Sequence, residues 1–165
     1  MATAIFFAST TGNSDEVASK ISSALGKIEV FNLANTKVDK INEYDKVILG
    51  GSTWGDGELN DDWEDAWVDF CKLDLSNKTI ALFGLGDQES YSDEFCSALG
   101  EIYKQVVALG AKVIGFTSTE GYHYDASKAQ IDNNFVGLVI DEDNQSELTD
   151  KRIEDWVQNI KEDIL

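Results

Sequence analysis

The chain has 165 residues, 42% of them hydrophobic and 10% aromatic, which fits one globular domain with a substantial core. Its formal net charge of −18 at pH 7 argues against nucleic acid or an anionic membrane as a partner, because both would be repelled. Cys71 and Cys96 lack metal-ligand spacing and favour a reduced, cytoplasmic setting. The N-terminus shows neither a signal peptide nor a membrane span, so we expect a single cytoplasmic domain over residues 1–165.

Apolar runs and helical patterns alternate along the chain. Runs that suit buried strands occur at 4–8, 28–33, 46–51 and 79–85. Helical spacing of apolar residues follows each run, at 15–25, in a weak segment ending near 41, at 63–70 and at 95–109. Gly26 and Gly110 stand where a glycine commonly ends a helix.

The pattern changes after residues 112–116, which are predicted to begin a fifth strand. Residues 117–134 are polar and interrupt this strand as an inserted loop, and the strand resumes at 135–140. His123 lies in the insertion without a Cys or His at metal-ligand spacing. We therefore expect its side chain to be exposed to solvent.

A last helix is predicted to begin at Thr149, with this residue as N-cap and Leu148 and Ile153 as a hydrophobic staple. Its inward face is expected to comprise Trp156, Val157, Ile160 and Ile164. The repeated strand–helix pattern predicts an α/β fold, with a parallel sheet covered on both faces and right-handed crossovers. Ligands of such sheets bind at the carboxyl ends of the strands, at the topological switch point.

The stretch Ser9-Thr10-Thr11-Gly12-Asn13-Ser14 joins the first strand to the first helix. Backbone N–H groups and the positive end of the helix dipole gather at such a junction and suit a phosphate. The stretch lacks the Lys of the GxxxxGK[ST] motif, which argues against a nucleoside-triphosphate hydrolase. Ser, Thr and Asn also favour helix starts that bind nothing, so a phosphate site and a plain N-cap cluster are equally open from this stretch alone.

Three further segments follow strands at the same edge of the predicted sheet. They are residues 52–59 (STWGDGEL), residues 84–91 (GLGDQESY) and Asp143. Trp54 and Tyr91 lie in these predicted loops, whereas core aromatic residues come from the interiors of helices and strands. Each could merely cover loop backbone, but two such residues beside a phosphate loop favour a flat ligand stacked between them.

With these segments in place, the chain resembles a flavodoxin of the long-chain type over essentially its whole length. The family pattern T/S-x-T-G-x-T matches residues 9–14, except that Ser14 replaces the usual Thr. STWGDGEL and the GDQ that precedes Tyr91 match the two flavin-stacking loops, and residues 141–153 (DEDNQSELTDKRI) also match. The resemblance implies a flavodoxin-like three-layer sandwich, with a five-stranded parallel sheet in the order 2-1-3-4-5, and bound FMN.

The resemblance also implies which residues bind the cofactor. The implied set is Ser9, Thr10, Thr11, Gly12, Asn13, Ser14, Ser52, Thr53, Trp54, Gly55, Asp56, Gly84, Leu85, Gly86, Asp87, Tyr91 and Asp143. Residues 9–14 would hold the phosphate, and Ser52, Thr53 and Asp143 would lie along the ribityl chain. Trp54 and Tyr91 would sandwich the isoalloxazine ring, and backbone groups at 55–56 and 85–87 would meet its edge.

The implied function is that of a low-potential, one-electron carrier rather than an enzyme. Its non-covalently bound FMN would pass electrons between redox enzymes by cycling through the oxidised, semiquinone and hydroquinone states. Carboxylates that oppose negative charge on the reduced ring crowd both loops: Asp56, Glu58, Asp61, Asp62, Glu64, Asp65, Asp87, Glu89, Asp93 and Glu94. The acidic rim would dock a monomer on basic surfaces of redox proteins, such as a ferredoxin/flavodoxin-NADP reductase.

Two alternatives remain open on the sequence. An FMN-dependent NAD(P)H:quinone reductase-like enzyme shares the fold but needs one face of the ring free, and Trp54 and Tyr91 on opposite faces argue against that. A phospho-acceptor signalling domain needs a carboxylate at the end of the third strand, where this chain has Gly50-Gly51-Ser52. The electron carrier is therefore the favoured interpretation.

Overall fold

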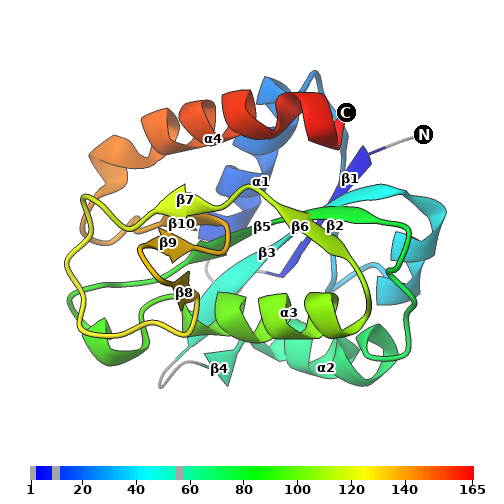
Figure 1. Ribbon diagram of the computed structural model, residues 1–165, viewed down its shortest axis with the longest axis horizontal. Coiled ribbons are helices and arrows are strands. Elements are labelled where there is room, and N and C mark those ends of the chain that lie inside the picture. The colour runs from blue at the N-terminus through cyan, green and yellow to red at the C-terminus, as the bar shows by residue number, and fades with distance from the viewer. Residues whose placement is uncertain (1–2, 9–11, 55–57) are drawn as a thin grey trace.

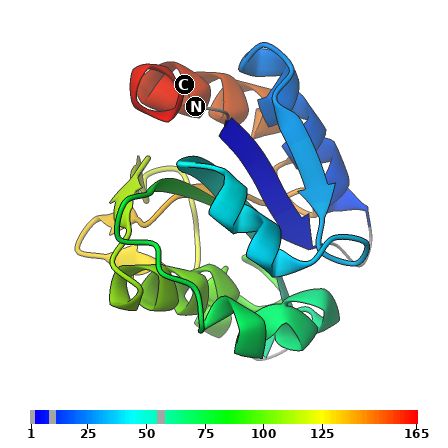
Figure 2. The ribbon, with the colours of Figure 1, turned by 90° about the vertical axis from the view of Figure 1, so that its right-hand side faces the viewer.

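A computed structural model gives the fold and describes residues 3–8, 12–54 and 58–165. Two layers of helices enclose a sheet, with α1 and α4 on one face and α2 and α3 on the other (Figure 1, Figure 2). The main-sheet strands are β1 (Thr3–Ala8), β2 (Glu29–Asn32), β3 (Lys46–Trp54), β4 (Glu58–Leu59), β5 (Thr79–Leu85), β6 (Lys112–Ile114) and β10 (Leu138–Ile140). The α-helices are α1 (Asn13–Ala24), α2 (Asp61–Phe70), α3 (Ser97–Ala108) and α4 (Thr149–Ile164), and the 3-10 helices are η1 (Val38–Glu43), η2 (Ser92–Glu94) and η3 (Ser146–Leu148).

Parallel pairing sets the strand order β10-β5-β3-β1-β2 among the described residues. β6 pairs with residues 79–81 of β5, and β10 pairs with residues 83–85, so β6 and β10 are the two halves of one interrupted strand. The predicted order 2-1-3-4-5 is therefore confirmed, as is the interruption of the fifth strand. At Gly137, just before β10, a Cβ would overlap the Leu82 carbonyl, so only glycine allows this approach to β5.

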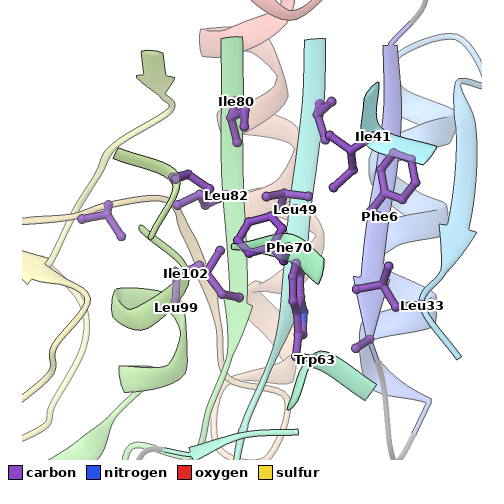
Figure 3. Close-up of a cluster of buried hydrophobic side chains, with 14 of the residues drawn as sticks. Phe6, Leu33, Ile41, Leu49, Trp63, Phe70, Ile80, Leu82, Leu99 and Ile102 are labelled. Carbon is purple, nitrogen blue, oxygen red and sulfur yellow. The ribbon is translucent and has the colours of Figure 1, made fainter. Parts of the chain in front are cut away.

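Both faces of the sheet are buried. Side chains alternate between the faces along each strand, so Phe6 lies in the core beneath α2 and α3, while Ile5 lies beneath α1 and α4. Figure 3 shows the first of these cores, in which Trp63 of α2 and Ile102 of α3 pack against the sheet. The Trp63 indole N–H also donates to the Gly50 carbonyl at 2.9 Å. Because the faces are covered, polar groups of this sheet can meet a ligand chiefly at the strand ends.

The third strand is longer than predicted. β3 continues to Trp54, and β4 pairs antiparallel with it at Thr53–Leu59 and Trp54–Glu58. The predicted loop at 52–59 is therefore partly strand. The apolar pattern stops at Gly51, but backbone pairing continues through the polar residues beyond it, because ladder hydrogen bonds do not require apolar side chains.

The insertion has more structure than the predicted loop. The strands β7 (Thr117–Ser118), β9 (Asn134–Phe135) and β8 (Gln130–Ile131) form a small antiparallel sheet in that order. The prediction that the fifth strand resumes at 135 is therefore wrong. Phe135 pairs with Thr117 and Gln130 in the small sheet, and the fifth strand resumes only at Leu138. An apolar run shows that residues 135–140 are buried, but not which sheet they join.

The predicted cap of the last helix is wrong. Thr149 is already helical, at φ −58° and ψ −50°, and Leu148 occupies the N-cap position without a side-chain cap. The 3-10 helix η3 runs directly into α4, so the extended backbone that a capping Thr needs is missing. Leu148 is 37% exposed, whereas the predicted inward face from Trp156 to Ile164 is buried. Within the described ranges, no helix is long and apolar enough to cross a membrane.

Candidate functional site

The first part of the candidate site is the start of α1. Gly12 caps this helix in the left-handed region, at φ 89°, where a residue with a Cβ would be strained. Asn13 is the first helical residue, and Ser14 follows in the first turn, 1% exposed. The Ser14 hydroxyl is buried without a hydrogen-bond partner among the described residues. A buried donor without a partner at a helix N-terminus is suited to an anionic ligand.

Some of the predicted phosphate-loop and ring-contacting residues cannot be placed in this site. Ser9, Thr10, Thr11, Gly55 and Asp56 lie outside the described residues, as does the side chain of Trp54. Their predicted roles stay predictions.

The end of β3 supplies the second part of the site. Ser52 and Thr53 are half-buried, and Ser52 is paired with Leu85 of β5. The Thr53 hydroxyl accepts a hydrogen bond of 3.1 Å from the Ala98 N–H in the first turn of α3. Thr53 therefore helps to fix α3 and still has its own hydroxyl proton to donate.

The loop after β5 is organised by Asp87. Gly84 and Leu85 end β5 in buried positions, and Gly86 follows, with its N–H donating to the Ile140 carbonyl at 3.1 Å. The Asp87 carboxylate accepts hydrogen bonds from the backbone N–H groups of Glu89 and Ser90, at 3.1 and 2.9 Å. It also accepts one from the Asn144 side chain at 2.8 Å.

These hydrogen bonds affect the ionisation of Asp87. Burial alone would raise the pKa of Asp87, but the hydrogen bonds from Ser90, Asn144 and Glu89 outweigh it, so the pKa lies below its ordinary value. Tyr91 ends the same loop and is 46% exposed, so it is not a core residue. Its predicted contact with the flavin ring stays a prediction.

The loop after β10 carries Asp143. Asp143 is exposed, and its backbone N–H donates to the Asp141 carboxylate at 3.1 Å. Burial raises the pKa of Asp143, and the charges of Asp87, Asp141 and Glu142 raise it further. The Asn144 side chain donates to both Asp87 and Asp141, at 2.8 and 2.9 Å, so the loops after β5 and β10 bring these two carboxylates close together.

Sequence reasoning missed Asp141, Gln88 and Asn144. The Asp141 side chain is fully buried, and Gln88 is 3% exposed. The backbone and side-chain N–H groups of Gln88 donate to the Asp141 carboxylate across the two loops. One signal was available: an acidic residue stands directly after the apolar strand 138–140, where a charge is costly unless it has partners. The insertion joins the cluster as well, because the His123 N–H donates to the Gln88 side chain at 2.6 Å. The His123 side chain is exposed, as predicted.

The fold and this edge together define a doubly wound α/β protein in which strand ends and a helix N-terminus meet at one place. A family model described as Flavodoxin matches residues 5–156. The chain is 47% identical to a flavodoxin of Helicobacter pylori over 157 residues, covering 95% of this chain and 94% of that protein. It is 44% identical to flavodoxin 1 of Escherichia coli K12 over 165 residues, covering 98% and 94%.

Solved structures agree with these sequence relatives. A crystal structure of Fusobacterium nucleatum flavodoxin bound to flavin mononucleotide matches with a TM-score of 0.93 and 35% identity, covering 100% of both chains. The chain belongs to the flavodoxin family, as the motif resemblance implied.

The opposite pKa shifts of Asp87 and Asp143 lead to opposite pH dependences of apoprotein stability. Asp87→Ala should lower the free energy of unfolding by about 1 kcal/mol at pH 7. Because the folded pKa of Asp87 is lowered, the part of this loss that depends on its ionisation should disappear as the pH falls from about 4, the unfolded value, through the folded value. Asp143→Asn should instead stabilise the protein at pH 7, since a raised folded pKa means that the charged form disfavours folding.

The gain from Asp143→Asn should disappear as the pH falls through the raised folded value of Asp143 and then below about 4. Urea unfolding of the apoproteins between about pH 7 and 3 measures both differences. A stability difference of the same sign for both variants at pH 7 would contradict the opposite directions of the two pKa shifts.

Proposed function

We propose that this protein is a low-potential, one-electron carrier that binds FMN non-covalently at the edge formed by α1, β3, β5 and β10. When bound, FMN supplies the redox chemistry, because it can take up and release electrons singly. The chain's own residues bind the phosphate, orient the ring and set the charge around it. The flavodoxin of Fusobacterium nucleatum, which has the same fold, was solved with FMN bound and so supports this proposal.

The observation that carries the proposal is the buried Ser14 hydroxyl without a partner among the described residues. Burying an unpaired hydroxyl is unfavourable unless another group satisfies it. A phosphate oxygen at the N-terminus of α1 would accept its proton and also face the helix dipole. In the full proposed binding set, residues 9–14 would hold the phosphate, while Ser52, Thr53 and Asp143 would contact the ribityl chain.

The ring would lie between Trp54 and Tyr91, with the backbone of residues 55–56 and 84–87 at its edge. Exposed carboxylates of α2 and of the loop after β5 surround this place, among them Asp61 and Glu89. A carboxylate ~10 Å from the ring opposes an added negative charge by about 0.4–1.7 kcal/mol, depending on the effective dielectric constant. Several such groups together favour a low reduction potential.

We also infer the wider setting of the protein. The two cores share one sheet, which supports a single domain over residues 1–165. Cys71 and Cys96 are free thiols, which supports a reducing, cytoplasmic location. The interrupted fifth strand supports the long-chain type, and the acidic rim supports transient docking of a monomer on basic surfaces of redox enzymes.

Ser14→Ala tests the phosphate site. The variant should bind FMN about 1.5–3 kcal/mol more weakly, roughly 10- to 150-fold, because it loses a donor to an anion. Its riboflavin affinity should not change, and its apoprotein should be equally or more stable, because an unpaired buried hydroxyl has been removed. Fluorescence titration measures both affinities, and Ser19→Ala, at an exposed position of the same helix, is the matched control. Equal losses for riboflavin and FMN would argue against a phosphate contact.

Mixing with a nicotinamide distinguishes a carrier from an enzyme. The purified holoprotein should show the visible absorption of one FMN per chain and should not be bleached rapidly by NADH or NADPH alone. The physical reason is that Trp54 and Tyr91 would cover both faces of the ring and leave no face for direct hydride transfer. Stopped-flow absorbance measures the rate, with an added NADPH-dependent reductase as positive control. Fast bleaching without the reductase would favour the quinone-reductase-like alternative.

Charge neutralisation tests the docking surface. Replacing Asp61, Asp62, Glu64 and Asp65 of α2 by their amides should slow reduction by a basic partner, mainly at low ionic strength. The effect should shrink near 0.1 M salt, where screening shortens these fields to ~10 Å. A control changes the same total charge on α4, on the opposite side of the sheet, with Glu154, Asp155, Glu162 and Asp163 as amides. Equal rates for both variants at low salt would place docking elsewhere.

A further inference from the structure

The side chain of Asp141 lies at the end of β10 and is fully buried. Five N–H groups of the described residues donate to its carboxylate. The backbone and side chain of Gln88 and the side chain of Asn144 donate to Oδ2, at 3.0, 2.8 and 2.9 Å. The backbone N–H groups of Asp143 and Asn144 donate to Oδ1, at 3.1 and 3.0 Å. Both oxygens are therefore saturated with donors.

The donors come from two different loops. Gln88 belongs to the loop after β5, which also holds Asp87 and Tyr91, and Asn144 belongs to the loop after β10. The Asn144 amide donates to both Asp141 and Asp87, so it bridges two carboxylates, one in each loop. Asp141 is thus the shared acceptor through which the two loops are held together.

The Asp141 carboxyl group has no cationic partner to offset its burial within the part of the chain that the structure describes. It takes part in none of the ion pairs found among the described residues. Burying a carboxyl group without a cation beside it is costly unless donors satisfy its oxygens, as the N–H groups do here. The cluster is also directional, because the two N–H groups of Gln88 reach Asp141 only when the two loops lie in this arrangement.

We propose that Asp141 is a positioning residue for the flavin ring, since it locks the loop after β5 against the loop after β10. This inference rests on the proposed binding of FMN. The lock would fix the backbone of Gly86 and Asp87 at the ring edge, together with Tyr91, at the distance that the ring requires. It would act on the ring end of the cofactor and leave the phosphate end, at the start of α1, untouched.

Asp141→Asn tests the lock with almost no change in size. Whichever way its amide is turned, an NH₂ group replaces either Oδ1, which has two donors, or Oδ2, which has three. At least two N–H groups then lose their acceptor and face another donor. We expect FMN affinity to fall at least tenfold, and riboflavin affinity to fall by the same factor, because the change acts on the ring. The visible circular dichroism of FMN at saturation should also change.

A second readout needs no cofactor. In the apoprotein, the backbone amides of Gln88 and Asn144 should exchange with solvent at least tenfold faster in Asp141→Asn, while amides of β1 and β3 keep their protection. Glu142→Gln is the matched control, since it removes one charge at the next residue without touching the cluster. It should change both affinities less than threefold. Should Asp141→Asn fail to fold, Gln88→Met removes the side-chain donor to Asp141, together with the acceptor of the His123 N–H, and should shift the same readouts in the same direction.

The outcomes separate this inference from the proposed function. Failure of the wild-type protein to bind FMN would overturn the proposed function. Normal binding by the wild-type protein, with ligand affinities and dichroism unchanged in Asp141→Asn, would overturn the positioning role alone. A loss of FMN affinity without loss of riboflavin affinity would also overturn it, because the effect would then lie at the phosphate.

Discussion

The parallel register of β1, β3 and β5 is the constraint on which the rest of the structure depends. It sets Ala8 beside Gly51 and Ser52 beside Leu85, so β1 and β5 end at nearly the same level, while β3 runs past both to Trp54. Ile140 of β10 pairs with Leu85, which brings a fourth segment to the same edge. A slip of one residue would turn buried side chains toward the wrong face, so two apolar cores fix this register. The proposed binding edge is thus a consequence of hydrophobic burial far from it.

The carboxylates of this protein fall into two physical classes. Those on α2, such as Asp61 and Glu64, are exposed, and their influence is long in range but weakened by salt. Asp141 is fully buried, and its carboxyl oxygens accept hydrogen bonds from both loops around it. The first class suits association with a basic partner and control of the reduction potential. The second suits the geometry of a binding site, because desolvated hydrogen bonds are strong and directional.

The two ends of the proposed cofactor site depend on different interactions. At the start of α1, a helix dipole, the left-handed Gly12 and the Ser14 hydroxyl would meet a phosphate in a chain whose net charge is −18. Short-range donors can outweigh this repulsion, because distant surface charges are screened by solvent while hydrogen bonds are not. At the other end, Asp141 and Asn144 hold two loops in place rather than contacting charge on a ligand. In the proposed site, binding the phosphate and positioning the ring would therefore fall to separate groups of residues.

The sequence by itself determined the elements whose cause is local. A continuous apolar run placed β5 at 79–85, because a strand covered on both faces buries successive side chains. Helical spacing with Gly110 placed the end of α3, because burial of one helix face repeats with the period of the backbone. The predictions of the strand order and of FMN as the cofactor came from motifs that match a known family. This resemblance covers the whole chain, and the comparisons confirm the family.

Only the tertiary structure decided the features whose partners are distant. Ser52, in the extension of β3 beyond Gly51, pairs with Leu85, and Thr117 of the small sheet in the insertion pairs with Phe135, so both features depend on distant backbone. Gln88 and Asp141 are 53 residues apart, and the sequence around either residue does not predict their hydrogen bond. Periodicity records which side of an element is buried, whereas a hydrogen bond between loops depends on where the completed sheet places their ends.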